Sequence, residues 1–134
     1  MSACGTATYS FIEDEPGVIQ IYNRGWYWWL FFAYWNLPGR AGEFSPEGKL
    51  HVNFNPFGDG NVQLPPNYFI LDTDYDSYTV VYACFPVAGG TAISEDAWIL
   101  SRERTLEQSK VDQLIAKAKK VVDYDWDTNN VKTL

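Results

Sequence analysis

The chain has 134 residues, a formal net charge of −7 and an aromatic content of 17%. This length suits a single domain, residues 1–134, that can bury its own core. The acidic balance argues against nucleic acid as a partner, because phosphate recognition needs a basic surface.

Alternation of apolar and polar residues predicts strands over Gly5–Phe11, Val18–Asn23 and Lys49–Phe54. Asn23 falls on the apolar face of its strand, where a polar side chain needs a partner from protein, water or ligand. His51 falls on the opposite face from the apolar residues of the third strand. We therefore expect it to be an exposed strand residue rather than a metal or haem ligand, and no cysteine spacing predicts a metal site.

The segment Trp26–Trp35 contains only apolar and aromatic residues and follows neither a strand nor a helix period. It is too short to cross a bilayer. Three interpretations are open: a surface for self-association or membrane contact, burial in a rearranged core, or an unnatural or mis-spliced segment. A further short segment, Pro38–Phe44, follows it.

The second half begins with a predicted hairpin, whose arms are Tyr68–Leu71 and Thr79–Ala83. Asp, Thr and Ser residues between the arms favour a turn because their side chains bond to nearby backbone. Pro86–Asp96, which contains two adjacent glycines, is predicted to be a loop. Ala97–Ser101 then predicts a short strand.

The period changes to that of an amphipathic helix over residues 106–121, Leu106 to Val121. Thr105 and Gln108 have the spacing of a capping box, with Thr105 at the N-cap. The apolar face of this helix must dock on a sheet. The predicted fold class is therefore all-β, an antiparallel up-and-down β-barrel, complete or lacking a strand, with one C-terminal α-helix packed outside.

Two segments resemble conserved regions of the lipocalin family, in its apolipoprotein D and insect bilin-binding, insecticyanin-like branch. Leu71–Tyr78, with Val80–Cys84, resembles the second region, and Ala97–Arg102 resembles the third. The family's second to fifth strands are similar, in turn, to Cys4–Tyr9, Val18–Asn23, Gly39–Ala41 and Lys49–Phe54. The resemblance thus covers nearly the whole chain except Trp26–Leu37.

The chain also departs from the family pattern. The first strand with its Gly-x-Trp motif is absent, so Arg102 lacks the tryptophan that the matching arginine covers in relatives. The cysteines that pair with the residues matching Cys4 and Cys84 are absent as well. The two thiols are either free or joined to each other. The resemblance implies a structural role for Thr73, Asp74, Tyr75 and Arg102 at the closed end of the barrel.

The resemblance implies a carrier that binds or sequesters a small hydrophobic ligand: a bilin, steroid, retinoid, carotenoid or fatty acid. The cofactor it implies is a non-covalently bound bilin such as biliverdin, or another hydrophobic small molecule. It also implies secretion, although no signal peptide follows Met1. Matching position by position, the ligand-binding residues are Tyr9, Asn23, Phe54, Tyr68, Trp98 and Leu100. Strand alternation independently places all of these except Tyr68 on inward faces.

Three alternatives are weighed against this function. The six side chains could simply fill a collapsed interior. The chain could be an interaction module that uses Trp26–Trp35 for self-association as a homo-oligomer or for peripheral membrane contact. It could also be an isomerase that uses the Cys4 thiol on a lipid peroxide, although alternation turns Cys4 away from Tyr9 and no activating base is evident. We expect no enzymatic activity and no catalytic residue.

Overall fold

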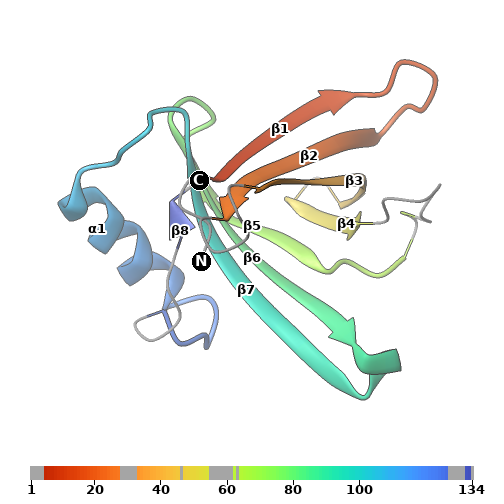
Figure 1. Ribbon diagram of the computed structural model, residues 1–134. Coiled ribbons are helices and arrows are strands. Elements are labelled where there is room, and N and C mark those ends of the chain that lie inside the picture. The colour runs from red at the N-terminus through yellow and green to blue at the C-terminus, as the bar shows by residue number, and fades with distance from the viewer. Residues whose placement is uncertain are drawn as a thin grey trace. The chain divides into compact units, whose positions relative to one another are not determined.

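The computed structural model describes residues 5–27, 33–45, 47–54, 62, 64–126 and 132–133 (Figure 1). They form eight β-strands, one α-helix and a single 3-10 turn. The chain divides into two compact units, Met1–Asn67 and Tyr68–Leu134. No helix among the described residues is long and apolar enough to cross a membrane.

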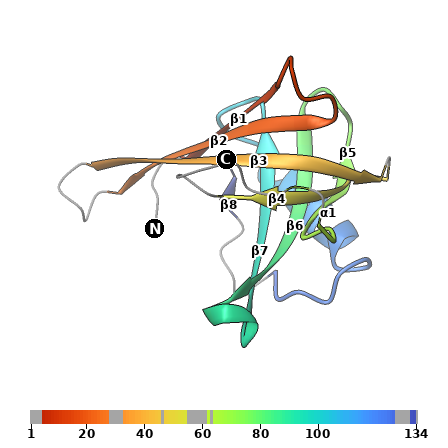
Figure 2. The same ribbon diagram turned by 90° about the vertical axis from the view of Figure 1, so that its right-hand side faces the viewer.

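The first unit is an antiparallel meander in which each strand pairs with the next along the chain (Figure 2). Its strands are β1 (Gly5–Phe11), β2 (Val18–Tyr27), β3 (Ala33–Ser45) and β4 (Lys49–Asn53). Glu15 N donates to Ile12 O at 3.2 Å in the turn between β1 and β2, where Gly17 takes a φ of 82°. The three strands predicted in this half are confirmed.

The register of this meander separates its two faces. Ile19 pairs with Ala41, which pairs with Val52, so these side chains share one face. Ile21 and Asn23 lie on the same face of β2, which we call the Asn23 face. Ile21, Ala41 and Val52 are at most 2% exposed. The apolar residues of the alternating pattern are therefore buried at these positions of β2, β3 and β4, whereas Tyr9 and Phe11 of β1 are exposed.

β2 and β3 take up part of the aromatic run that had no predicted structure. Trp26 pairs with Tyr34 and Tyr27 with Ala33, so the run forms the two arms of a hairpin. Aromatic residues favour strands. The pairing of two strands accounts for a structure that no period in the sequence indicated. The side chains of residues 26–35 and the backbone of residues 28–32 lie outside the described part of the chain. The three interpretations of this run therefore remain untested.

The second unit combines antiparallel strands with the helix. Its elements are β5 (Tyr68–Thr73), β6 (Tyr78–Val87), the 3-10 turn η1 (Ala88–Gly90), β7 (Ala92–Ser101), α1 (Gln108–Ala118) and β8 (Lys132–Thr133). β5, β6 and β7 are antiparallel neighbours, and β8 adds a short parallel pair to β7. The sequence pattern did not predict β8, because two residues are too few to show alternation.

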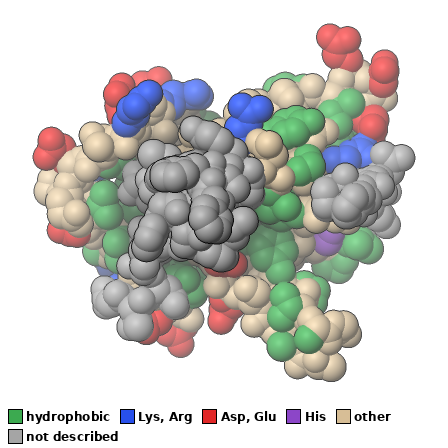
Figure 3. Space-filling model, in the orientation of Figure 1, with side chains coloured by type: hydrophobic (Ala, Val, Ile, Leu, Met, Phe, Trp, Pro, Cys, Tyr) green, Lys and Arg blue, Asp and Glu red, His purple; other side chains and the backbone are tan. Residues whose placement is uncertain are grey.

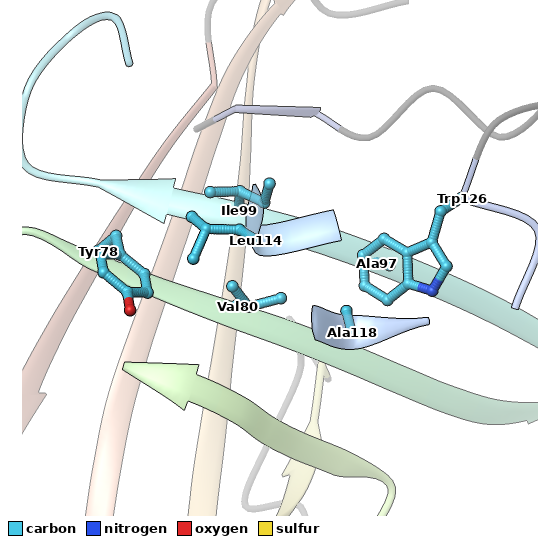
Figure 4. Close-up of a cluster of buried hydrophobic side chains, with 7 residues drawn as sticks. All are labelled: Tyr78, Val80, Ala97, Ile99, Leu114, Ala118 and Trp126. Atoms are coloured by element: carbon cyan, nitrogen blue, oxygen red, sulfur yellow. The ribbon is translucent and has the colours of Figure 1, made fainter. Parts of the chain in front are cut away.

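Helix α1 docks on one face of this sheet, as Figure 1 shows. The buried cluster is drawn in Figure 4 and comprises Tyr78, Val80, Ala97, Ile99, Leu114, Ala118 and Trp126. Leu114 and Ala118 come from the apolar stripe of the helix, four residues apart, and meet Val80 and Ile99 from neighbouring strands. Burying one side chain as large as leucine or isoleucine stabilises the fold by about 1.5–3 kcal/mol. This cluster therefore holds the helix on the sheet.

A β-bulge in β5 adds a polar anchor for the helix. The register with β6 shifts between Ile70 and Asp72, which turns Asp72 to the face that the helix covers. There Asp72 Oδ2 accepts hydrogen bonds from Tyr78 Oη and Lys117 Nζ, each at 3.1 Å. The carboxylate also raises the pKa of Lys117 through this hydrogen bond. Helix and sheet are thus joined by a charged contact beside the apolar one.

Two predictions in this unit are wrong in detail. Residues Pro86–Asp96 do not form a long loop, because β6 runs to Val87 and β7 begins at Ala92, leaving a tight turn. Their side chains are mostly exposed, so the alternation that marks a half-buried strand is absent. Figure 3 shows hydrophobic side chains at this tip, where Val87 and Ile93 are exposed.

The start of the helix was also predicted wrongly. α1 begins at Gln108 with Glu107 as its N-cap, and no side chain caps it. Thr105 therefore does not form the expected capping box with Gln108. Gln108 Nε2 instead donates to Asp112 Oδ1 at 2.8 Å, four residues along the helix.

Candidate ligand-binding site

The Asn23 face carries three of the six predicted ligand-binding residues. Tyr9 pairs with Ile21, and Asn23 lies one step further along the same side of β2. Tyr9 is 43% exposed, whereas Ile21 beside it is buried. On the Asn23 face, the side chain of Ile21 is therefore covered, whereas that of Tyr9 is accessible to solvent.

Phe54 lies on the same face, across Gly39. Phe54 follows Val52 by two residues, which gives its side chain the same direction as that of Val52. A Cβ atom on Gly39 would lie only 2.6 Å from Phe54 Cδ1, so the ring covers the bare backbone of β3 at this position. Glycine is needed here because any side chain would displace the ring.

Asn23 has an unsatisfied polar atom. Its side-chain oxygen, Oδ1, is buried and accepts no hydrogen bond from the residues that the structure describes. A buried acceptor without a partner costs about 1–3 kcal/mol, so such atoms are rare and call for an explanation. The atom lies on a face whose neighbours Ile21 and Ala41 are apolar. An added hydrogen-bond donor would be well matched at this position.

The other three predicted residues share one face of the second unit. Tyr68 pairs with Ala83, Val81 pairs with Trp98, and Leu100 lies two residues beyond Trp98. We call this the Trp98 face; it is the side of β5–β7 opposite the helix. The rings of Tyr68 and Trp98 stack, with centroids 6.3 Å apart and planes inclined by 22°. The resemblance alone had indicated that Tyr68 faces inward. Its ring thus contacts Trp98, for which strand alternation had indicated the same direction.

Val81 and Ala83 are further members of the Trp98 face that were not assigned to the site. Both are at most 1% exposed. No alternation marks them in the sequence, because Val80 beside them is equally apolar and buried. Val81 pairs with Trp98, so these apolar side chains lie beside its ring on the same face.

The turn between β5 and β6 is held by Asp74. Its Oδ1 accepts hydrogen bonds from the backbone N–H groups of Ser77 at 2.7 Å and Tyr78 at 3.0 Å. The Ser77 hydroxyl donates to Oδ2, and these bonds to the ionised form hold the pKa of Asp74 well below its usual range. Tyr75 takes a φ of 64° and is 90% exposed.

Thr73 and Arg102 tie the same turn to its surroundings. Thr73 Oγ1 accepts from Tyr75 N at 3.0 Å and donates to Tyr78 O at 2.8 Å. Arg102 Nε donates to Asp76 O at 2.9 Å, so its guanidinium caps the turn from the end of β7. All four residues that the resemblance implied as structural thus meet in or beside one turn.

The remaining chemically interesting residues lie away from these faces. Cys84 is a half-buried free cysteine that points to the opposite side of β6 from Ala83, while Cys4 lies outside the described residues. His51 lies in β4, as expected, but is half-buried rather than exposed, and its Nδ1 lies 2.7 Å from Pro65 O. Within the described part of the chain no group of His, Cys, Asp and Glu could hold a metal ion.

Comparison with a family model identifies the fold. A model described as a lipocalin-like domain matches residues 2–133. The chain belongs to the lipocalin family. Two curated lipocalin relatives are similar in sequence: apolipoprotein D of Macaca fascicularis is 33% identical over 116 residues, and the Lazarillo protein of Schistocerca americana is 41% identical over 64 residues.

Solved lipocalin structures agree with this assignment. Lobster apocrustacyanin A1 and apocrustacyanin C2 each give a TM-score of 0.63 with 23% sequence identity, covering 93% of this chain. The lipocalin fold predicted from the sequence is thereby confirmed. The matches span 54% of apolipoprotein D, 28% of Lazarillo and 63% of each apocrustacyanin chain. The chain thus spans only part of the length of these relatives.

Proposed function

We propose that this lipocalin carries or sequesters a small hydrophobic molecule that also bears a hydrogen-bond donor. The observation that carries the proposal is the buried Asn23 Oδ1, which no described residue satisfies, on an otherwise apolar face. A ligand hydroxyl, protonated carboxyl or ring N–H would satisfy it. In the second unit, the stacked Tyr68 and Trp98 form an apolar surface of their own that suits the flat body of a hydrophobic molecule.

This donor requirement narrows the ligand classes. Bilins carry pyrrole and lactam N–H groups, and steroids and retinoids can carry hydroxyl groups, whereas the carboxyl group of a fatty acid donates only in its protonated form. A hydrocarbon without any donor would leave Asn23 Oδ1 buried and unpaired. Biliverdin fits the donor set because it offers several N–H groups on a flat conjugated body. We further propose that the protein acts in the extracellular space, as the family resemblance implies, and that binding involves no turnover.

The binding test uses a panel of biliverdin, a retinoid, a steroid and a long-chain fatty acid. Each is titrated into the protein while tryptophan fluorescence is followed. We expect saturable quenching by at least one ligand, and a Trp98→Ala variant should raise its Kd about tenfold or more because a large stacking surface is lost. Tyr22→Ala is the matched control, since Tyr22 is an exposed ring on the other side of β2 from Asn23.

Two outcomes would contradict the proposal. One is the absence of saturable quenching by every ligand in the panel. The other is an equal change in Kd in the Trp98→Ala and Tyr22→Ala variants, which would place binding away from the Trp98 face. An absorption spectrum of the protein from its natural source tests the bilin directly, because a bound bilin gives a visible band.

A further inference from the structure

Gly39 is a glycine that the backbone of β3 does not require. It lies within an extended strand and does not take a positive φ, whereas Gly17 and Gly48 in turns do. Any residue can adopt the backbone conformation of an ordinary strand. The reason for a glycine at this position therefore lies in the space that a side chain would fill.

The ring of Phe54 takes up that space. A Cβ atom added to Gly39 would lie 2.6 Å from Phe54 Cδ1 and 3.0 Å from Phe54 Cε1, and its third neighbour would be Asn53 O at 3.2 Å. This Cβ would point to the Asn23 face, because Gly39 pairs with Ile21. The Phe54 ring thus lies closer to the β3 backbone than it could lie over any residue with a side chain.

The β3 backbone at Gly39 is held from its other face. Gln20 pairs with Arg40 and lies on that face, where its Nε2 donates to Gly39 O at 2.8 Å. Pro38, the residue before Gly39, has a fixed φ. A side chain added at position 39 would therefore displace the ring of Phe54 rather than the strand. Carbon atoms in contact are about 3.5–4.0 Å apart, so the ring would have to move by about 1 Å.

Phe54 and Asn23 are neighbours on the Asn23 face. Asn23 pairs with Leu37, which lies two residues from Gly39 along β3. Diagonal neighbours of this kind on paired strands are about 7–8 Å apart. A molecule that donates a hydrogen bond to Asn23 Oδ1 and extends over β3 would therefore meet the Phe54 ring. Displacing the ring by about 1 Å would leave less room for the body of that molecule.

We propose that Gly39 and Phe54 form a specificity-determining pair that sets how thick a ligand body the Asn23 face accepts. The pair acts only if a hydrophobic ligand binds this face, so its role rests on the proposed function. Gly39 is a positioning residue that lets the ring lie low on β3, and the ring contacts the ligand. A flat conjugated chain needs little clearance above the ring, whereas a fused-ring body with projecting methyl groups needs more.

The test compares two probes that each carry one hydroxyl group but differ in thickness. Retinol has a flat conjugated chain, and pregnenolone has a fused-ring body with projecting methyl groups. Equilibrium dialysis of each radiolabelled probe gives its Kd for the unmodified chain, for Gly39→Ala and Phe54→Ala, and for the double variant. Gly39→Ala should raise the Kd of pregnenolone about tenfold and that of retinol less than about threefold, because a loss of clearance excludes the thicker body first.

The second readout is the dependence on Phe54. In the Phe54→Ala background, adding Gly39→Ala should change the ratio of the two Kd values less than about twofold, because no ring is left to displace. Phe54→Trp places a larger ring over an unchanged Gly39. It should shift the ratio in the same direction as Gly39→Ala, so the test does not depend on the folding of one variant.

Gly42→Ala is the matched control, because it makes the same change on the other face of β3. The new Cβ would lie 2.6 Å from Val62 O, away from the Asn23 face. Gly42→Ala should therefore lower stability without altering the ratio of the two Kd values. Urea unfolding of every variant measures stability and checks that the fold is retained.

Three outcomes would overturn the role of the pair. One is failure of either probe to bind the unmodified protein, although saturable binding of biliverdin or a fatty acid would still leave the proposed function standing. The second is an equal rise in Kd for both probes in Gly39→Ala, which would give Gly39 a purely structural role. The third is an effect of Gly39→Ala on the ratio that persists undiminished in the Phe54→Ala background.

Discussion

Replacing Asn23 by leucine should stabilise the ligand-free protein and weaken ligand binding. Asn23 Oδ1 is buried without a partner among the described residues, and its neighbours on the sheet are apolar. Removing an unsatisfied buried acceptor recovers a desolvation cost of about 1–3 kcal/mol. Because Asn23 as a whole is only half-buried, we expect the lower end, about 1 kcal/mol of added stability. The same change removes the acceptor for the ligand and should raise its Kd about tenfold.

The assay compares urea unfolding of the ligand-free variants with ligand titrations of the same samples. Asn36→Leu is the control, since Asn36 is exposed on the other face of β3 and its substitution should change stability by less than about 0.5 kcal/mol. Opposite signs for stability and affinity are specific to a polar group kept for binding. A loss of stability in Asn23→Leu would refute the reasoning, because it would mean that Oδ1 has a structural partner in the ligand-free protein.

Two further predictions concern the helix and the β5–β6 turn. Leu114→Ala should lower the free energy of unfolding by about 2–5 kcal/mol, because Leu114 is fully buried in the cluster beneath α1. As a control, Val121→Ala just beyond the helix should lower it by less than about 0.5 kcal/mol, because Val121 is exposed. Equal losses for the two variants in chemical denaturation would contradict the docking of the helix. Asp74→Asn should destabilise the protein at neutral pH, and the difference from the unmodified protein should shrink below about pH 4. The hydrogen bonds to Asp74 lower its pKa in the folded protein. Their stabilisation is therefore present above the pKa of Asp74 in the unfolded chain and is lost as pH falls through its pKa in the folded protein. A difference in melting temperature between the two proteins that stays constant down to pH 2 would contradict this loss.

Alternation along the chain predicted most of the fold because the strands are half-buried. Ile21 and Val52 are buried and their neighbours are not, so the sequence pattern carries the same information as the structure. The sequence pattern is uninformative where that contrast is absent. Residues around Pro86 and Ile93 are exposed on both faces of their hairpin, and the pattern predicted a loop.

The candidate site was predicted less directly. Alternation placed Asn23 and Trp98 on apolar faces, but it could not show that Asn23 Oδ1 lacks a hydrogen-bond partner, since that depends on side chains from several strands. The stacking of Tyr68 on Trp98 likewise joins residues thirty positions apart. Their roles in binding stay predictions until a ligand is tested. The bulge that turns Asp72 toward the helix has no sequence signal that we recognise.

The same strands carry the proposed binding surface and the helix-docking surface on opposite sides. Along β7, Ala97 and Ile99 pack beneath the helix, while Trp98 and Leu100 point the other way. Substitutions one residue apart should therefore separate the two properties: a change at Ile99 should lower stability, and a change at Trp98 should lower affinity. The same arrangement places helix α1 behind the Trp98 face, where it supports the sheet. The helix fixes the backbone of β6 and β7, so a ligand would meet rings already held in place and would lose less entropy in ordering them.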